Sequence, residues 1–192
     1  SNGYANEAST TQNGNSVDYN AEPVTVIVSK DGQADPTNTA PVHFKVVFSK
    51  PVADFTKDDV SCVLPSGTPA ITVSPNDGSL HDTYDVAVDG MGICSGTVKC
   101  SVGADKVHDE TGNTNTASNI ESVEFDNVNP DVTINKASGQ DDPTITSPIH
   151  FTVVFSENVA DFATGDVSIS GSAGATTAVI TGSGKQYDVE VS

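Results

Sequence analysis

Residues 41–55, PVHFKVVFSKPVADF, decide the fold, because residues 148–162, PIHFTVVFSENVADF, repeat them almost unchanged at an offset of 148 − 41 = 107 residues. The flanks repeat in the same order: GQADPT at 32–37 matches GQDDPT at 139–144, and YDVAV at 84–88 matches YDVEV at 187–191. Self-similarity at a fixed period indicates an internal duplication and a periodic parent protein.

A third, partial copy opens the chain. GYANEAS at 3–9 followed by SVDY at 16–19 is similar to GNTNTAS at 112–118 followed by SVEF at 122–125. We therefore expect three parts: residues 1–20 as the terminal strand of a preceding or neighbouring module, 21–129 as a complete domain, and 130–192 as an incomplete domain that lacks its last two strands.

The complete copy contains seven short apolar runs, separated by clusters of Gly, Pro, Asp and Asn that favour turns. Alternation along the second run predicts that Val42, Phe44, Val46 and Phe48 face a core. Ile149, Phe151, Val153 and Phe155 take the same places in the second copy. Seven strands in a domain of this size indicate an all-β fold of tandem immunoglobulin-like antiparallel β-sandwiches.

Composition excludes several classes of protein. Only 35% of the 192 residues are hydrophobic and 6% are aromatic, which argues against a helical bundle. The net charge is −18, with 26 acidic residues and no Arg, so nucleic-acid binding and docking on an anionic membrane are not expected. The longest apolar runs are far shorter than the ~20 residues that cross a bilayer, so no membrane insertion is expected.

Three stretches carry a family resemblance: VTINKASGQDDPT at 132–144, PIHFTVVFSENVADFATGDVSISG at 148–171 and, in the first copy, DETGNTNTAS at 109–118. They resemble the bacterial-type Ig-like repeats of large secreted adhesins and other extracellular proteins. The resemblance covers nearly the whole chain. It implies a non-enzymatic extender, stalk or filament-forming structural module at an extracellular or cell-surface location, often stiffened by calcium. The alternative is an adhesin module that binds a glycan or a protein through loops such as 65–83.

The expected partners are neighbouring Ig-like repeats of the same protein or identical subunits. The two strands missing from 130–192 are expected from the continuing chain or, by strand exchange, from another subunit. Strand exchange through SVDY would supply only the seventh strand, whereas a continuous array of repeats supplies the sixth and the seventh together. The continuous array is therefore the favoured route.

Acidic residues concentrate in the loops and in the linker DNVNPD at 126–131. Ordinary Ig connectivity would bring oxygen atoms from two domains and this linker together, and Ca²⁺ takes ~6–8 such ligands. The predicted calcium ligands are Asp35, Asp126, Asn129, Asp131, Glu157 and Asp161; the equivalent preceding junction would use Asp18, Asn20, Asp54, Asp105, Asp109 and Asn113. The same residues also suit ordinary turns, because Asp and Asn side chains bond their own backbone. The spacing of an EF-hand does not occur in the sequence.

All three cysteines lie in the first copy. Cys62 and Cys100 point inward on the third and sixth strands, which are neighbours in this fold, so they are the candidate disulfide pair. Cys94 and Cys100 are a poorer pair, because six extended residues span ~20 Å and a disulfide needs Cα atoms within ~7 Å. Three buried, unpaired cysteines are the alternative. GICSG at 92–96 matches a nucleophile elbow only superficially, since it lacks the strand-to-helix context, and no enzyme is predicted.

Overall fold

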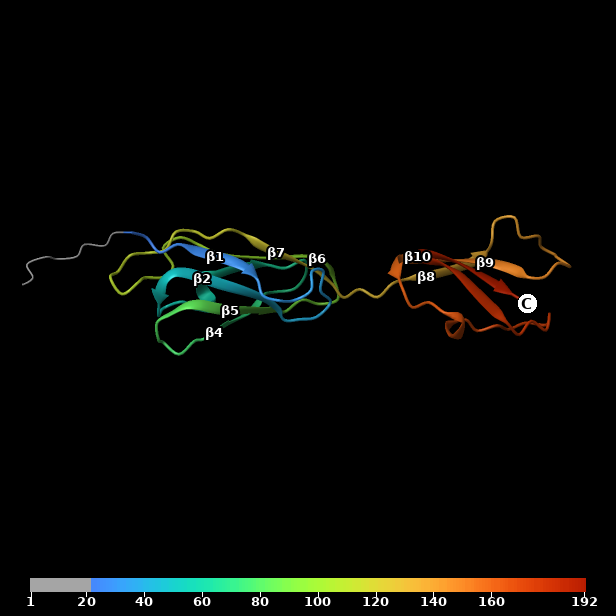
Figure 1. Ribbon diagram of the computed structural model, residues 1–192, viewed down its shortest axis with the longest axis horizontal. Helices are drawn as coiled ribbons and strands as arrows, with labels where there is room; N and C mark the ends of the chain where they lie inside the picture. Colours follow the sequence, from blue (N-terminus) through green and yellow to red (C-terminus); the bar gives the residue numbers. More distant parts are fainter. Residues whose placement is uncertain (1–21) are drawn as a thin grey trace, which may run out of the picture. The chain divides into compact units, whose positions relative to one another are not determined.

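The computed structural model describes residues 22–192 (Figure 1). The predicted terminal strand in residues 1–20, together with Asp18 and Asn20, lies outside this part. The described residues form an all-β protein with antiparallel sheets, and its two short 3-10 turns are η1 (Lys57–Asp59) and η2 (Thr164–Asp166). The chain divides into two compact units: unit 1 ends at Asn127 and unit 2 comprises Val128–Ser192. This boundary lies two residues before the one expected from the repeats.

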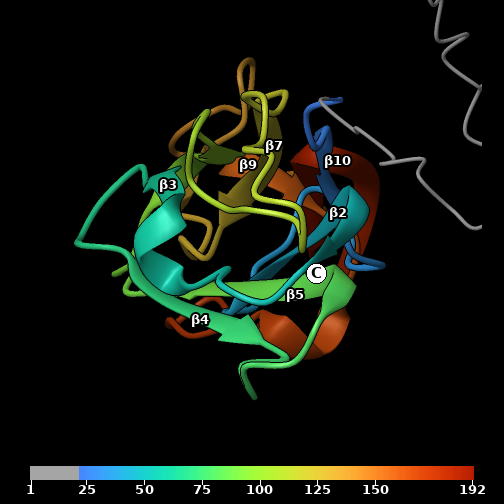
Figure 2. The same cartoon turned by 90° about the vertical axis from the view of Figure 1, so that its left-hand side faces the viewer.

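Within residues 22–127, unit 1 contains seven strands: β1 (Val26–Lys30), β2 (Val42–Val52), β3 (Val60–Val63), β4 (Ala70–Ser74), β5 (His81–Asp89), β6 (Ser95–Val102) and β7 (Glu121–Asp126). They form two antiparallel sheets, one in the order β1-β2-β5-β4 and the other in the order β3-β6-β7. In the end-on view of Figure 2, β4 and β5 lie on one side of unit 1 and β3 and β7 on the other.

A single apolar core fills the space between the two sheets of unit 1. The prediction for β2 is confirmed, because Val42, Phe44, Val46 and Phe48 are at most 2% exposed. The three-stranded sheet contributes Val98, Cys100, Val102, Val123 and Phe125 to the same buried cluster. The core therefore depends on both sheets, and each covers the apolar face of the other.

Unit 2 contains one sheet, formed by β8 (Val132–Lys136), β9 (Ile149–Val159) and β10 (Ala178–Val191) in the order β10-β9-β8. Thr177 and Ser192 exchange backbone hydrogen bonds of 2.9 and 3.0 Å, so β10 doubles back on itself as a hairpin. Gly182, at φ 119°, allows the tight turn, because a Cβ there would lie 2.5 Å from the carbonyl oxygen of Gln186. β8, β9 and the β10 hairpin are thus the counterparts of β1, β2 and the β4–β5 pair.

Details of side-chain packing recur between the two units. In each, two Phe rings and one Tyr ring pack edge to face, at centroid distances of 5.0–5.9 Å; the trios are Phe48, Phe55 and Tyr84 in unit 1 and Phe155, Phe162 and Tyr187 in unit 2. The Tyr84 hydroxyl donates to the carbonyl oxygen of Val52 at 2.7 Å, and the Tyr187 hydroxyl donates to that of Val159 at 2.6 Å. The duplication seen in the sequence is therefore also a duplication of local packing.

The units differ in the second sheet. In unit 1, β3 follows η1 and pairs with β6, with Val60 opposite Val102 and Cys62 opposite Cys100. In unit 2, the matching residues 167–170 follow η2 but form no strand, although the sequence favours one there. The described residues of unit 2 contain no counterpart of β6, and an isolated strand without a hydrogen-bonding partner is not stable.

Candidate functional site

The inner face of the unit 2 sheet, which we call the open face, exposes apolar side chains whose counterparts in unit 1 are buried. It carries Val132 and Ile134 on β8 and Phe151 on β9, together with residues 167–169 beside them. Val132 is 57% exposed and Ile134 is 56% exposed, whereas their counterparts in unit 1, Val26 and Val28, are 5% and 2% exposed. The difference in exposed fraction arises because the β3-β6-β7 sheet covers Val26 and Val28 in unit 1, and no such sheet forms among residues 128–192 of unit 2.

Two hollows on the open face show where apolar groups fit. A hollow of about 430 Å³ is lined by Val132, Ile134, Phe155 and Phe162, among others. A second, of about 260 Å³, lies over Ile134, Phe151 and Val189. The lining is mainly β-branched and aromatic, so the face is suited to burying apolar side chains from another element and not to acid–base chemistry.

Of the six predicted calcium ligands, Asp35 and Asp126 belong to unit 1. Asp35 pairs with the Lys30 ammonium group and also accepts a hydrogen bond of 2.9 Å from the backbone N–H of Glu124. The hydrogen bond from Lys30 is the main cause that lowers the pKa of Asp35. Asp126 ends β7, and its N–H donates to the carbonyl oxygen of Thr37 at 2.9 Å. Asp35 thus already ties the 30–35 loop to β7.

The other four predicted ligands belong to unit 2. Asn129 and Asp131 are exposed before β8, and the backbone of Asp131 exchanges two hydrogen bonds of 2.9 Å with Ser156. Glu157 is half-buried within β9, and Asp161 is exposed after it. Neither unit by itself brings the six residues together, and calcium binding by them stays a prediction.

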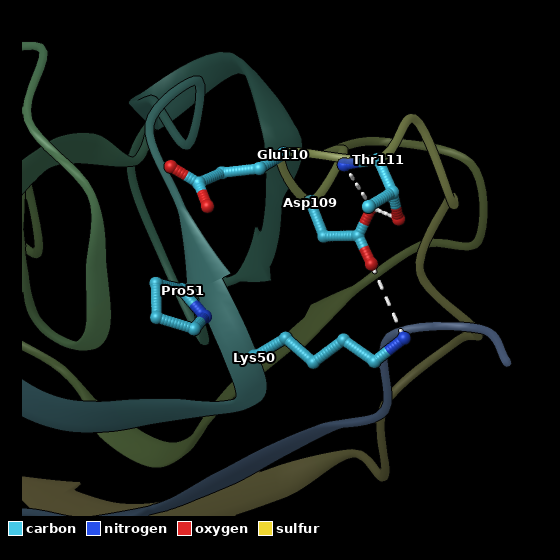
Figure 3. A pocket seen from close by; sticks show the side chains of 5 residues that line it. All are labelled: Lys50, Pro51, Asp109, Glu110 and Thr111. Atoms are coloured by element: carbon cyan, nitrogen blue, oxygen red, sulfur yellow. Dashed lines mark hydrogen bonds and ion pairs between the residues drawn. The ribbon is translucent and has the colours of Figure 1, made fainter. Parts of the chain in front are cut away.

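The predicted ligands of the preceding junction that the structure describes lie in loops at one end of unit 1. Figure 3 shows Asp109 beside Lys50 and Thr111, with the Glu110 side chain directed away from the ion pair. The distance from Lys50 Nζ to Asp109 Oδ2 is 3.2 Å. Hydrogen bonds from the Asn113 side chain, and then from Thr111, hold the pKa of Asp109 far below its ordinary value.

The carboxylates of two other acidic residues at this end of unit 1 also accept hydrogen bonds from neighbouring loops. Asp54 accepts from the backbone N–H of His108 and lies 2.9 Å from its Nδ1 atom. Asp105 accepts a hydrogen bond of 2.7 Å from the Thr114 hydroxyl. Asp54 and Asp105 thus join separate loop segments, whereas an ordinary turn would have their side chains bond their own backbone.

The cysteines of unit 1 are divided between a disulfide and one free thiol. Cys62 and Cys100 lie opposite each other on β3 and β6, with Cα atoms 4.2 Å apart, and form a disulfide. Cys94 is half-buried in the loop before β6, and its N–H donates to Asn127 Oδ1 at 2.8 Å. No helix follows it, so residues 92–96 do not have the geometry of a nucleophile elbow.

A cluster on the outer face of unit 2 was not predicted as a site from the sequence. His150 Nδ1 lies 3.0 Å from Asp188 Oδ2, and Glu190 brings a third ligand atom close to both. Alternation along YDVEV places Asp188 and Glu190 on one face, which is a signal that the sequence does contain. Their proximity to His150 depends on the pairing register between β9 and β10, which the sequence does not show.

No protein-family model matches the chain, and no curated protein matches it. Among residues 22–192, no helix is long and apolar enough to cross a membrane. The functional argument therefore depends on the geometry of the two units.

Proposed function

We propose that this chain is a structural extender or stalk module of a repetitive extracellular or cell-surface protein, built from tandem Ig-like sandwiches. The observation that carries the proposal is the open face. Unit 2 repeats the first sheet of unit 1 in detail, and it exposes the residues that unit 1 buries beneath β3, β6 and β7. A face of this kind is suited to strands from another repeat.

The occupant that fits the open face is a pair of strands of the β6–β7 type from a further repeat. In unit 1, Val98 and Val102 of β6 and Phe125 of β7 fill the space above the first sheet. The same side chains would cover Val132 and Ile134. β6 would also give residues 167–170 the pairing partner that β3 has in unit 1.

The Cys62–Cys100 disulfide supports the proposed compartment, because such bonds persist mainly in oxidising surroundings outside the cytosol. The charge of −18 supports a surface role, since like charges keep repeated modules soluble and apart. In serially linked repeats, each module contacts its neighbours and adds to the reach of the array.

A series of extended chains tests the proposal. Ser192 is the counterpart of Asp89, so residues 90–192 can be appended once, twice or three times in continuous register. In the added copies, Cys94→Ser and Cys100→Val avoid free thiols, because the counterpart of Cys62 in unit 2 is Ile169. Each addition completes one open face and creates one new one. Binding of an apolar fluorescent dye per chain should therefore stay constant, while the maximum dimension from small-angle scattering rises by an equal step.

The matched control carries Val98→Asp and Phe125→Asp in the added copies only. Dye binding should then increase with each addition, because the faces remain open. Dye binding that increases equally in the unsubstituted series would overturn the strand-pair proposal. A maximum dimension that does not increase with added copies would overturn the extender function.

A further inference from the structure

The outer face of unit 2 brings three metal-ligating groups together. In the antiparallel register, Glu190 lies directly opposite His150, and Asp188 lies opposite Thr152. His150, Asp188 and Glu190 therefore project from the same face of adjacent strands. One ligand atom from each lies within 4.8 Å of the other two, and all three residues are half-buried.

We propose that His150, Asp188 and Glu190 bind a divalent transition-metal ion of the Zn²⁺ type. Zn²⁺ holds imidazole nitrogen and carboxylate oxygen at about 2.0–2.2 Å, so its ligand atoms lie within about 4 Å of one another. Rotation of these half-exposed side chains covers the remaining difference. The imidazole favours Zn²⁺ over Ca²⁺, which prefers oxygen ligands alone.

The surroundings of the cluster suit a bound cation. The two carboxylates supply two negative charges, and His150 in its neutral form supplies a nitrogen ligand. Gln140 Oε1 accepts a hydrogen bond of 3.0 Å from the backbone N–H of His150, which fixes the neighbouring loop against β9. A hollow of about 290 Å³ borders His150 and Asp188 and has room for water to complete the coordination.

Unit 1 shows that the third ligand is specific to unit 2. There, His43 Nδ1 lies 3.1 Å from Asp85 Oδ1, and Gln33 bonds the backbone of His43 as Gln140 does that of His150. However, Ala87 stands opposite His43, in the place of Glu190. Lys45, whose counterpart is Thr152, lies opposite Asp85, and its ammonium group pairs with Asp31 at 3.4 Å. Unit 1 thus offers two metal ligands with a lysine, Lys45, at the neighbouring position. Unit 2 offers three ligands and has the uncharged Thr152 at that position.

Titration of the full chain with zinc chloride tests the site. Calorimetry should show one Zn²⁺ bound per chain, and in proton NMR spectra the ring signals of His150 should shift before those of His43. Glu190→Ala, which makes unit 2 resemble unit 1, should weaken binding about tenfold or more. The reciprocal change, Lys45→Thr with Ala87→Glu, should add a second equivalent.

His43→Ala is the matched control and should leave the affinity unchanged. Circular dichroism of each variant shows whether weaker binding comes from the loss of a ligand or from the loss of the fold. The second Zn²⁺ expected in unit 1 after Lys45→Thr with Ala87→Glu gives an independent test, because unit 2 is unchanged in that variant. The proposal is overturned if His150→Ala binds Zn²⁺ as tightly as the parent chain, or if His81 or His108 responds first. Binding of Ca²⁺ in place of Zn²⁺ would also contradict it.

Discussion

Single acidic residues of unit 1 stabilise the fold through hydrogen bonds that their charged forms accept. The pKa of Asp35 is lowered chiefly by Lys30, that of Asp77 by the backbone N–H of Ser79, and that of Asp109 by the Asn113 side chain. A carboxyl whose pKa is lower in the folded than in the unfolded state stabilises the fold while it is ionised. That stability is present above the unfolded pKa and is lost as pH falls towards the folded pKa.

We expect the free energy of unfolding of unit 1 to decrease once the pH falls below about 3.8, the ordinary value for these residues. Asp109→Asn should reduce the size of this decrease, because Asp109 has the most strongly lowered pKa of the three. Urea unfolding followed by circular dichroism at pH 6, 3.5 and 2.5 measures the effect. Asp58→Asn, at an exposed position, is the control; an Asp109→Asn chain with the parent pH profile would contradict the explanation.

At the scale of the element, the same strand has different energetic importance in the two units. β1 and β8 are counterparts and pair with β2 and β9 in the same way. Val28 of β1 is fully covered by the second sheet, whereas Ile134 of β8 remains 56% exposed. Hydrophobic stabilisation scales with the apolar area removed from water, so the residue type alone does not set its contribution.

The pair Val28→Ala and Ile134→Ala tests this reasoning. Val28→Ala should lower the free energy of unfolding of unit 1 by about 2 kcal/mol, the cost of removing buried methyl groups. Ile134→Ala should change the stability of unit 2 by less than about 0.5 kcal/mol. In the chain extended by residues 90–192, Ile134→Ala should become as costly as Val28→Ala. Denaturant unfolding of the parent, its two variants, the extended chain and its Ile134→Ala variant gives the comparison, and equal costs of the two substitutions in the unextended chain would contradict it.

At the scale of the whole molecule, the two units should unfold separately. The core of unit 1 draws on two sheets and a disulfide, whereas the fully buried core of unit 2 is confined to Val153, Tyr187 and Val189. Stability need not be uniform along a chain, and a unit with little buried apolar area opens first.

We expect two thermal transitions by calorimetry, with unit 2 melting at the lower temperature. Reduction of the Cys62–Cys100 bond, whose sequence separation is 38 residues, should lower the stability of unit 1 by about 4 kcal/mol and move only the upper transition. Cys62→Ala with Cys100→Ala should reproduce the effect without reductant, and Cys94→Ser should not. A reductant-sensitive lower transition would show that this assignment is wrong.

The sequence by itself determined the duplication, the all-β character, the strands of unit 1 and the inward face of β2. The duplication is visible when the sequence is compared with itself, and the other features are local, because alternation and turn residues act within a few positions of one another. Only the tertiary structure decided that residues 167–170 form no strand, that Ile134 stays exposed, and that His150, Asp188 and Glu190 converge. Each of these depends on whether a distant strand is present and in what register it pairs, and the periodicity of one strand carries no information about its partner.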